Sequence, residues 1–167
     1  LSRRDRSELP FLVAAEAGPE LLLDTCVYID RLQGKLPRLV TELLQLRQTN
    51  HSTVGVVEMM HAVGRLDPND RRTKSAIAAI GAAIDLIPAH RLYEPDAEIL
   101  GRAAMLAGIL SRTQGYRQDD RFRALNDSTL FLQALKFGQA VLTRNLVDFD
   151  LLSQMLPRGR VLFYTNE

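Results

Sequence analysis

The sequence predicts an α/β fold in which a central, mostly parallel sheet is flanked by helices. Short segments of strand character alternate along the chain with longer segments whose apolar residues have helical spacing. Residues 20–24 place three leucines between two acids, and an unbroken apolar run of this kind is typical of a strand buried on both faces. With 167 residues, 46% of them hydrophobic and 25% charged, the chain has the composition of a globular protein and the length of one domain.

Local signals place the elements along the chain. Gly34 and Pro37 separate the first helix from the second. Asn126 is a candidate N-cap for a helix that finishes at Gly138, and the polar stretch 116–125 before it is expected to be a loop. The expected helices cover residues 26–33, 37–48, 53–66, 70–86, 95–115, 126–138 and 147–156. The expected strands cover residues 20–24, 50–53, 86–90, 139–145 and 160–165.

Charge and cysteine content restrict the classes of protein. Residues 1–19 are expected to be a poorly ordered arm or a short helix before one domain that spans residues 20–167. The 21 basic and 20 acidic residues nearly balance, which argues against binding nucleic acid by bulk charge alone but allows a local basic surface. The single cysteine excludes an internal disulfide, so we expect a cytoplasmic protein with no membrane association.

Four carboxylates stand where such a fold would place a site. Parallel sheets bind ligands at the carboxyl ends of their strands, and Asp24 directly follows the first expected strand. Asp148 follows a later strand, Asp127 stands at the expected start of a helix, and Glu58 lies among apolar residues of another helix. Taken singly, each aspartate is also explained as a helix cap, which contributes about 0.3–1 kcal/mol, and Glu58 as a surface position.

Together these acids and their surroundings resemble the acidic motifs of the PIN-domain nucleases, most closely the VapC-type toxins of bacterial toxin–antitoxin pairs. The stretches that carry the resemblance are LLLDTCVYID, STVGVVEMMHA and NDSTLFLQALKFGQAVLTRNLVDFD. The most specific part is the end of the last stretch, where the expected strand finishes in T-R-N and D-F follows two residues later. The resemblance covers residues 20–165 and implies a single PIN-like α/β/α domain whose four acids converge on one metal site. It also implies supporting or substrate-positioning roles for Thr25, Ser52 or Thr53, Asn126 and Asn145.

Phosphodiester chemistry accounts for the number of acids. Mg²⁺ or Mn²⁺ prefers hard oxygen ligands, activates water and offsets the charge that builds on phosphate. Two carboxylates about 5 Å apart repel by roughly 3 kcal/mol at an effective dielectric near 20, so four of them call for a cation or for protons. We expect Asp24 and Asp127 to contact the metal directly, with Glu58 and Asp148 supporting one ion or recruiting a second. The expected function is a metal-dependent endoribonuclease that acts as a toxin.

The partners follow from the resemblance and from one basic cluster. Four arginines near the expected 116–125 loop form either a solvated surface or a rim that contacts RNA phosphates. They are Arg112, Arg117, Arg121 and Arg123. The resemblance implies a homodimer and a cognate antitoxin that covers the acidic groove, and the helices beginning at residues 37 and 53 are candidate surfaces for it.

Two functions of other classes stay open. One is a PIN-like domain that binds nucleic acid or a partner without cutting, and the other is a hydrolase of small phosphoesters. The stretch from Cys26 to Arg31 is one residue short of the C-x5-R loop of cysteine phosphatases and lacks its glycines. Aspartyl phosphotransferases need a second acid two residues after the first, where this chain has Cys26. The residues therefore favour the nuclease over both phosphatase types.

Overall fold

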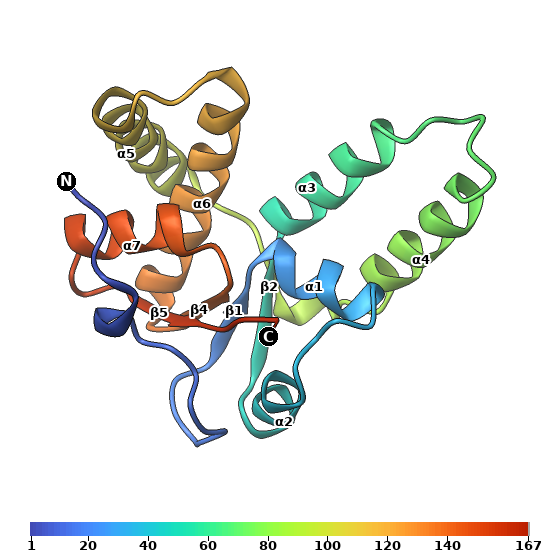
Figure 1. Cartoon of the computed structure of the whole chain (residues 1–167), viewed down its shortest axis with the longest axis horizontal. Coiled ribbons are helices and arrows are strands. Elements are labelled where there is room, and N and C mark those ends of the chain that lie inside the picture. Colours follow the sequence, from blue (N-terminus) through green and yellow to red (C-terminus); the bar gives the residue numbers. More distant parts are fainter. Residues whose placement is uncertain (167) are drawn as a thin grey trace.

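The structure, a computed structural model, describes residues 1–166, so residue 167 of the domain expected over 20–167 lies outside the described range. The described residues form five strands: β1 (Leu21–Leu23), β2 (Thr49–Ser52), β3 (Leu92–Tyr93), β4 (Ala140–Thr143) and β5 (Arg160–Phe163). They also form the helices α1 (Thr25–Leu32), α2 (Arg38–Leu46), α3 (Thr53–Gly64), α4 (Thr73–Asp85), α5 (Ala97–Gln114), α6 (Gln118–Phe137) and α7 (Leu146–Met155). Two 3₁₀ helices, η1 (Arg6–Glu8) and η2 (Ala89–Arg91), complete the set (Figure 1). Within residues 1–166, no helix has both the length and the apolar character that crossing a membrane requires.

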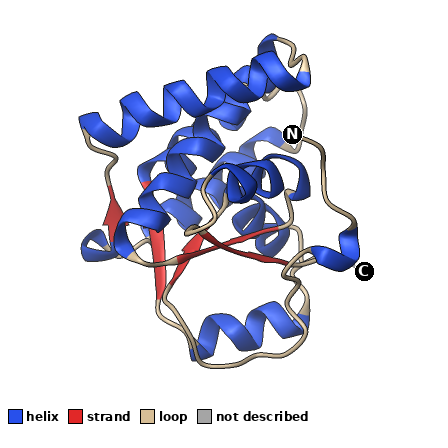
Figure 2. Cartoon of the chain, turned by 90° about the vertical axis from the view of Figure 1, so that its left-hand side faces the viewer, coloured by secondary structure: helices blue, strands red, loops and turns tan. Residues whose placement is uncertain are grey.

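The strands form one parallel sheet in the order β3-β2-β1-β4-β5. Helices α5, α6 and α7 pack on one face, while α1, α2 and α3 pack on the other (Figure 1). Figure 2 shows strands with helices both above and below them. Helices α3 and α4 extend together away from the side of the sheet that carries α5 and α6 (Figure 1). The predicted α/β/α architecture with a central sheet is therefore confirmed.

The leucine run of β1 is buried on both faces, as its sequence predicts. Leu22 belongs to the apolar core shared with α5, α6 and α7, whereas Leu21 and Leu23 belong to the core shared with α1, α2 and α3. Successive strand residues point to opposite faces, so three apolar residues in a row serve both cores. Full burial of each leucine contributes about 1.5–3 kcal/mol and fixes β1 at the centre of the sheet. Its carboxyl end is thereby held where two helical layers meet.

The stretch 116–125 is mostly helical, which corrects the expectation of a loop. Helix α6 has Arg117 as its N-cap, so Asn126 lies inside the helix and is not its cap. The ion pair between Asp120 and Arg123, three residues apart, supports the exposed first half of α6. The sequence of this stretch did not indicate a helix, because its many charged side chains leave no apolar stripe along one helical face.

The strand expected over residues 86–90 was also placed wrongly. Residues 89–91 form η2, with Pro88 as its N-cap, and the strand β3 starts only at Leu92. Proline fixes φ near −65° and has no N–H to donate, so it suits the start of a turn better than a paired strand position. The short apolar run around Pro88 therefore belongs to the approach to β3.

The first residues of the chain pack against the far edge of the sheet. Phe11 forms a parallel bridge with Phe163 of β5, and the Leu12 amide donates to the Phe163 carbonyl at 2.7 Å. Arg4 donates through Nε to Oδ1 of Asp150 on α7 at 2.6 Å. Within the segment expected to be an arm or a short helix, η1 is the helical part. The segment covers the exposed edge that β5 would otherwise present.

A methyl group at Gly159 is expected to destabilise the protein. A Cβ built there would lie 2.0 Å from Cζ of Phe131, a fully buried ring of α6, so the ring or the loop before β5 must move. We expect Gly159→Ala to cost about 1–3 kcal/mol, as overpacked cores do. Gly101→Ala is the matched control, because an added Cβ meets no described atom within 4 Å, and it should stabilise α5 by about 0.5–1 kcal/mol. Urea denaturation of both variants measures the difference, and equal stabilities would contradict the prediction.

Candidate active site

Asp24 stands at the carboxyl end of β1, beside the point where the strand order reverses. It is the N-cap of α1, with Oδ1 accepting from the Thr25 amide at 2.6 Å. Its Oδ2 accepts from Oγ1 of Thr143, at the end of the neighbouring strand β4, at 2.6 Å. Ligand sites of open parallel sheets lie at such switch points. Asp24 is thus both a helix cap and a member of the candidate site, and the two interpretations of its position do not compete.

Glu58 reaches the same edge of the sheet from α3. Its Oε2 accepts a hydrogen bond from the Thr25 hydroxyl, and its Oε1 accepts from Nδ2 of Asn126 at 3.0 Å. Thr25 follows Asp24 directly, so one residue ties the first acid to the second. Glu58 is half-buried, and its carboxylate is a part of the cluster and not a surface charge.

Asp127 and Asp148 come together through Asn145. The Nδ2 atom of Asn145 donates to Oδ2 of Asp127 at 2.8 Å and lies 3.5 Å from Oδ2 of Asp148. Asn145 is also the N-cap of α7, which places Asp148 in the first turn of that helix, as predicted. Tyr116 donates its hydroxyl to Oδ1 of Asp148 at 2.5 Å. Both aspartates are almost fully buried, which is costly for a charged group unless it is bonded.

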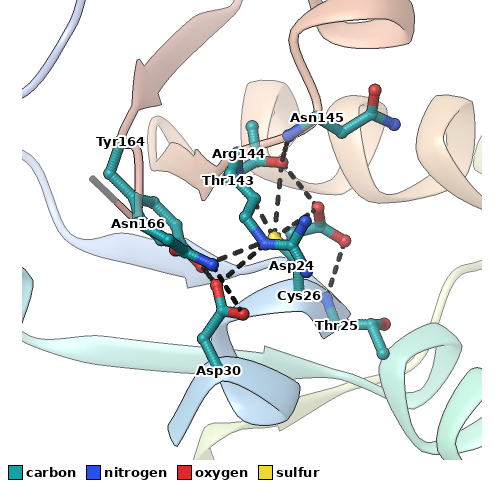
Figure 3. A network of polar contacts seen from close by, with 9 residues as sticks. All are labelled: Asp24, Thr25, Cys26, Asp30, Thr143, Arg144, Asn145, Tyr164 and Asn166. Carbon is teal, nitrogen blue, oxygen red and sulfur yellow. Dashed lines mark hydrogen bonds and ion pairs between the residues drawn. The ribbon is translucent and has the colours of Figure 1, made fainter. Parts of the chain in front are cut away.

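A continuous chain of hydrogen bonds joins all four acids. Thr143 Oγ1, which donates to Asp24, also accepts from the Asn145 amide at 2.9 Å (Figure 3). The chain of contacts therefore runs from Glu58 through Thr25, Asp24, Thr143 and Asn145 to the last two acids. The structure brings together residues from the β1–α1 junction, α3, α6 and the segment from the end of β4 to the start of α7.

Burial and mutual repulsion disfavour the charged forms of these acids. Burial raises the pKa of Asp24 and that of Glu58. The pKa of Asp127 is raised well above its usual range, first by burial and then by the charges of Asp24, Asp148 and Glu58. A carboxyl group whose pKa is raised by three neighbouring carboxylates belongs to a cluster with surplus negative charge. Such clusters are frequent at functional sites.

The donors of this cluster fit a hard divalent cation in chemical kind. Carboxylate oxygens are the ligands that Mg²⁺ and Mn²⁺ prefer, and a cation would relieve the repulsion. Among residues 1–166, however, no three His, Cys, Asp or Glu side chains are placed as they stand to hold one ion together. The carboxylates instead face the hydroxyl and amide groups of Thr25, Thr143, Asn126 and Asn145.

The other residues expected at the site differ in their placement. Thr25, Asn126 and Asn145 contact the acids, but the Ser52 hydroxyl caps α3 and donates to Gln133. Thr53 begins α3 and is half-buried. Of the four arginines, Arg123 lines a hollow of about 370 Å³ beside Glu58, together with residues of α3 and α6. The remaining three, Arg112, Arg117 and Arg121, have exposed side chains around the start of α6.

Four residues at or beside the site were not predicted: Asp30, Thr143, Arg144 and Tyr164. Thr143 binds Asp24, and Arg144 pairs through Nε with Asp30 at 2.8 Å (Figure 3). The T-R-N triplet, which begins at the last residue of β4, was the one available signal, because it places a donor and a cation directly at a carboxyl end. Asp30 gave no signal, since a single acid in an amphipathic helix is ordinarily solvated.

Fold and site together define an α/β domain with an acidic centre at the carboxyl ends of two adjacent parallel strands. No family model matches the sequence, and a search of curated proteins finds no match. Solved structures do match. A chain in the crystal structure of VapBC2 from Rickettsia felis, bound to a DNA fragment from their promoter, superposes with a TM-score of 0.60 at 11% identity, covering 87% of this chain and 98% of that chain.

Two further structures give the same result. DNA-bound VapBC from Salmonella typhimurium matches with a TM-score of 0.56 at 18% identity, over 86% of this chain and 97% of that chain. FitAcB from Neisseria gonorrhoeae matches with a TM-score of 0.58 at 20% identity, over 86% and 96% of the two chains. At these identities the likeness establishes a shared fold, and it confirms the predicted PIN-like fold.

Proposed function

We propose that this chain is a Mg²⁺- or Mn²⁺-dependent endoribonuclease that acts as the toxin of a toxin–antitoxin pair. The observation that carries the proposal is the hydrogen-bonded cluster of four carboxylates at the carboxyl ends of β1 and β4. The pKa of Asp127 is raised by burial and by the other three charges, as expected of a site built for a cation. The shared fold with chains of the VapBC and FitAcB structures supports the assignment to this class.

Each residue has a distinct task in the proposed reaction. Asp24, Asp127, Asp148 and Glu58 would hold the metal, which, when bound, lowers the pKa of a water and offsets charge on the phosphate. Thr143 and Asn145 orient the carboxylates of Asp24 and Asp127 through the bonds they donate. Thr25 holds Glu58 in the same way. These donors lie at or just after the carboxyl ends of β1 and β4, so the sheet fixes the positions of the acids.

A groove beside the acids fits the proposed antitoxin. It has a volume of about 380 Å³ and lies between α1, α3 and α4. Its walls are mostly apolar, with Ile29, Met59 and Ile80 among them, and Glu58 stands at its edge. An amphipathic segment that ends in a basic side chain would match both features. Of the two helices predicted as the antitoxin surface, α3 lines this groove and α2 does not, and the groove adds α1 and α4 to the proposed surface.

The proposed homodimer has a candidate surface on the projecting pair α3 and α4. Val57 and Met60 of α3 and Ile77 of α4 are all substantially exposed. Large exposed apolar side chains that gather on neighbouring elements mark interaction surfaces. The same helices line the apolar groove, so partner binding and dimer formation would use adjacent faces.

Metal-dependent cleavage of RNA tests the proposed function. The purified chain is expected to cut a structured RNA when Mg²⁺ or Mn²⁺ is present, and to stop when a chelator is in excess. Asp24→Asn should slow cleavage at least about 100-fold, because several kcal/mol of charge stabilisation are lost with the metal. Ser75→Ala, at an exposed position of α4, is a control that should cut like the wild type.

The outcomes separate the alternatives. Folded protein without metal-dependent cutting would favour a domain that binds nucleic acid or a partner only. Turnover of a chromogenic phosphomonoester faster than RNA would favour a small-molecule phosphoesterase. Equal cutting by Asp24→Asn and wild type would point to a contaminating nuclease and would reject the site.

A further inference from the structure

Arg144 occupies a special position beside the acidic cluster. It directly follows Thr143, the residue that donates to Asp24, and its own amide donates to Sγ of Cys26 at 3.4 Å. Its positive charge acts on Asp24, since it favours the ionised form of that carboxyl. Figure 3 shows the guanidinium between the carboxylates of Asp24 and Asp30. The cation therefore lies next to the site and on the same edge of the sheet.

Arg144 forms an ion pair with a buried acid, Asp30. Asp30 of α1 is 1% exposed and accepts from Arg144 Nε at 2.8 Å. It also accepts from the Tyr164 hydroxyl at 2.6 Å and from Nδ2 of Asn166 at 3.2 Å (Figure 3). Asp30 is thus fixed by groups that follow β5, and it fixes Arg144 in turn. A carboxylate with three donors is a rigid anchor for a flexible side chain.

The anchor leaves the outer half of the guanidinium available. The Arg144 side chain is 42% exposed, and neither of its Nη atoms has a hydrogen-bond acceptor within residues 1–166. Arg4 offers a contrast, because it binds Asp150 through Nε, Ser153 through Nη2, and Asp150 again through its amide. Arg4 is thus held as a structural clamp through its amide, Nε and Nη2. Arg144 is held at one side only and keeps a planar pair of donors for another acceptor.

We propose that Arg144 binds a phosphate of the RNA substrate through its two Nη atoms, held in position by Asp30, Tyr164 and Asn166; this inference rests on the proposed ribonuclease function. Paired N–H donors of a guanidinium match two phosphate oxygens. A phosphate that approaches four acids is repelled by them, and a fixed cation at their edge offsets that repulsion. Arg144 is then a substrate-binding residue, and the three groups around it are positioning residues that act through it.

RNA affinity measured at several salt concentrations tests the inference. A fluorescent single-stranded RNA is titrated with wild type, Arg144→Ala and Arg4→Ala in excess chelator, so that binding is separated from cutting. We expect Arg144→Ala to weaken binding about 10–100-fold, as loss of a charged hydrogen-bonding partner does. It should also reduce the slope of log K against log salt by about 0.7, because one phosphate contact on a single strand is lost.

The matched variants separate binding from folding. Arg4→Ala removes an ion pair of the same kind, with an Nε–carboxylate distance of 2.6 Å against 2.8 Å for Arg144, and should lower the melting temperature without changing RNA affinity. Tyr164→Phe keeps every charge, so it should leave the salt slope unchanged while the Kd for RNA rises about 2–5-fold, because Arg144 is held less firmly. Arg144→Lys should keep the salt slope but not the affinity, because lysine lacks the planar pair of donors.

Each outcome decides between the two proposals. Wild-type affinity and slope in folded Arg144→Ala would overturn the role of Arg144, even if the chain cuts RNA. A chain that binds RNA through Arg144 but never cuts it with metal would uphold this inference and reject the ribonuclease. Absence of RNA binding by the wild type at every salt concentration would reject the role of Arg144 as well.

Discussion

Asp127→Asn is expected to stabilise the metal-free protein and to abolish its RNA cleavage. Asp127 is buried inside α6, and burial together with the charges of Asp24, Asp148 and Glu58 raises its pKa well above the usual range. Its carboxylate therefore opposes folding near pH 7. Asparagine has nearly the same size and can still accept the bond from Asn145, so we expect a gain of about 1–3 kcal/mol in the free energy of unfolding. Cleavage should fall at least about 100-fold, because a metal ligand is lost.

The control for this variant is Asp150→Asn. Asp150 is equally buried but pairs with Arg4 at 2.6 Å, so its carboxylate supports folding. The same substitution should there cost about 1–3 kcal/mol and leave cleavage unchanged. Denaturant unfolding in excess chelator measures both variants beside the wild type. Destabilisation by both substitutions would show that the acids of the site do not repel one another as the structure indicates.

Mg²⁺ or Mn²⁺ is expected to raise the melting temperature of the wild-type chain. An ion that binds only the folded state adds about 2.7 kcal/mol when its concentration is 100 times its Kd. For a domain of this size that corresponds to a shift of about 5–10 °C. The double variant Asp24→Asn, Asp127→Asn should lose most of the shift, and NaCl at equal ionic strength serves as the control. A titration without any shift would remove the metal from the proposed function.

The repulsion between the carboxylates of the site also determines how the stability of the metal-free protein changes with pH. A raised folded-state pKa means that the folded protein binds protons more tightly than the unfolded chain. For Asp127 the stability contribution is complete below its ordinary pKa of 3.8 and is lost as the pH rises through the raised value. In chelator, acidification from pH 7 should therefore stabilise the wild type relative to Asp127→Asn. Melting curves at several pH values check this, and identical curves for the two proteins would contradict it.

Local sequence determined the elements that carry their own signals. The three leucines of β1 required burial on both faces, and Asp24 behind them had to stand at a carboxyl end, because strand direction and side-chain alternation follow from the backbone alone. Asn145 and Asp148 could be placed at the start of α7 for the same reason, since caps act within one turn. The alternation of strands and helices along the chain was predictable on this basis, whereas the PIN-like fold was predicted from the resemblance of the acidic motifs to those of PIN-domain nucleases.

Tertiary structure decided what depends on contacts between distant segments. The exposed start of α6 has no apolar stripe, so only the continuation into the core shows that Asn126 and Asp127 lie in mid-helix. Asp30 and Arg144 are 114 residues apart, and no residue near Asp30 in the sequence indicates that the two form an ion pair. The resemblance marked the four acids as a set, with Thr25, Asn126 and Asn145 as supporting residues, but the donor Thr143 became visible only when β1 and β4 were paired. Hydrogen bonds of this kind form between side chains that the sheet brings together, and that juxtaposition is a property of the whole fold.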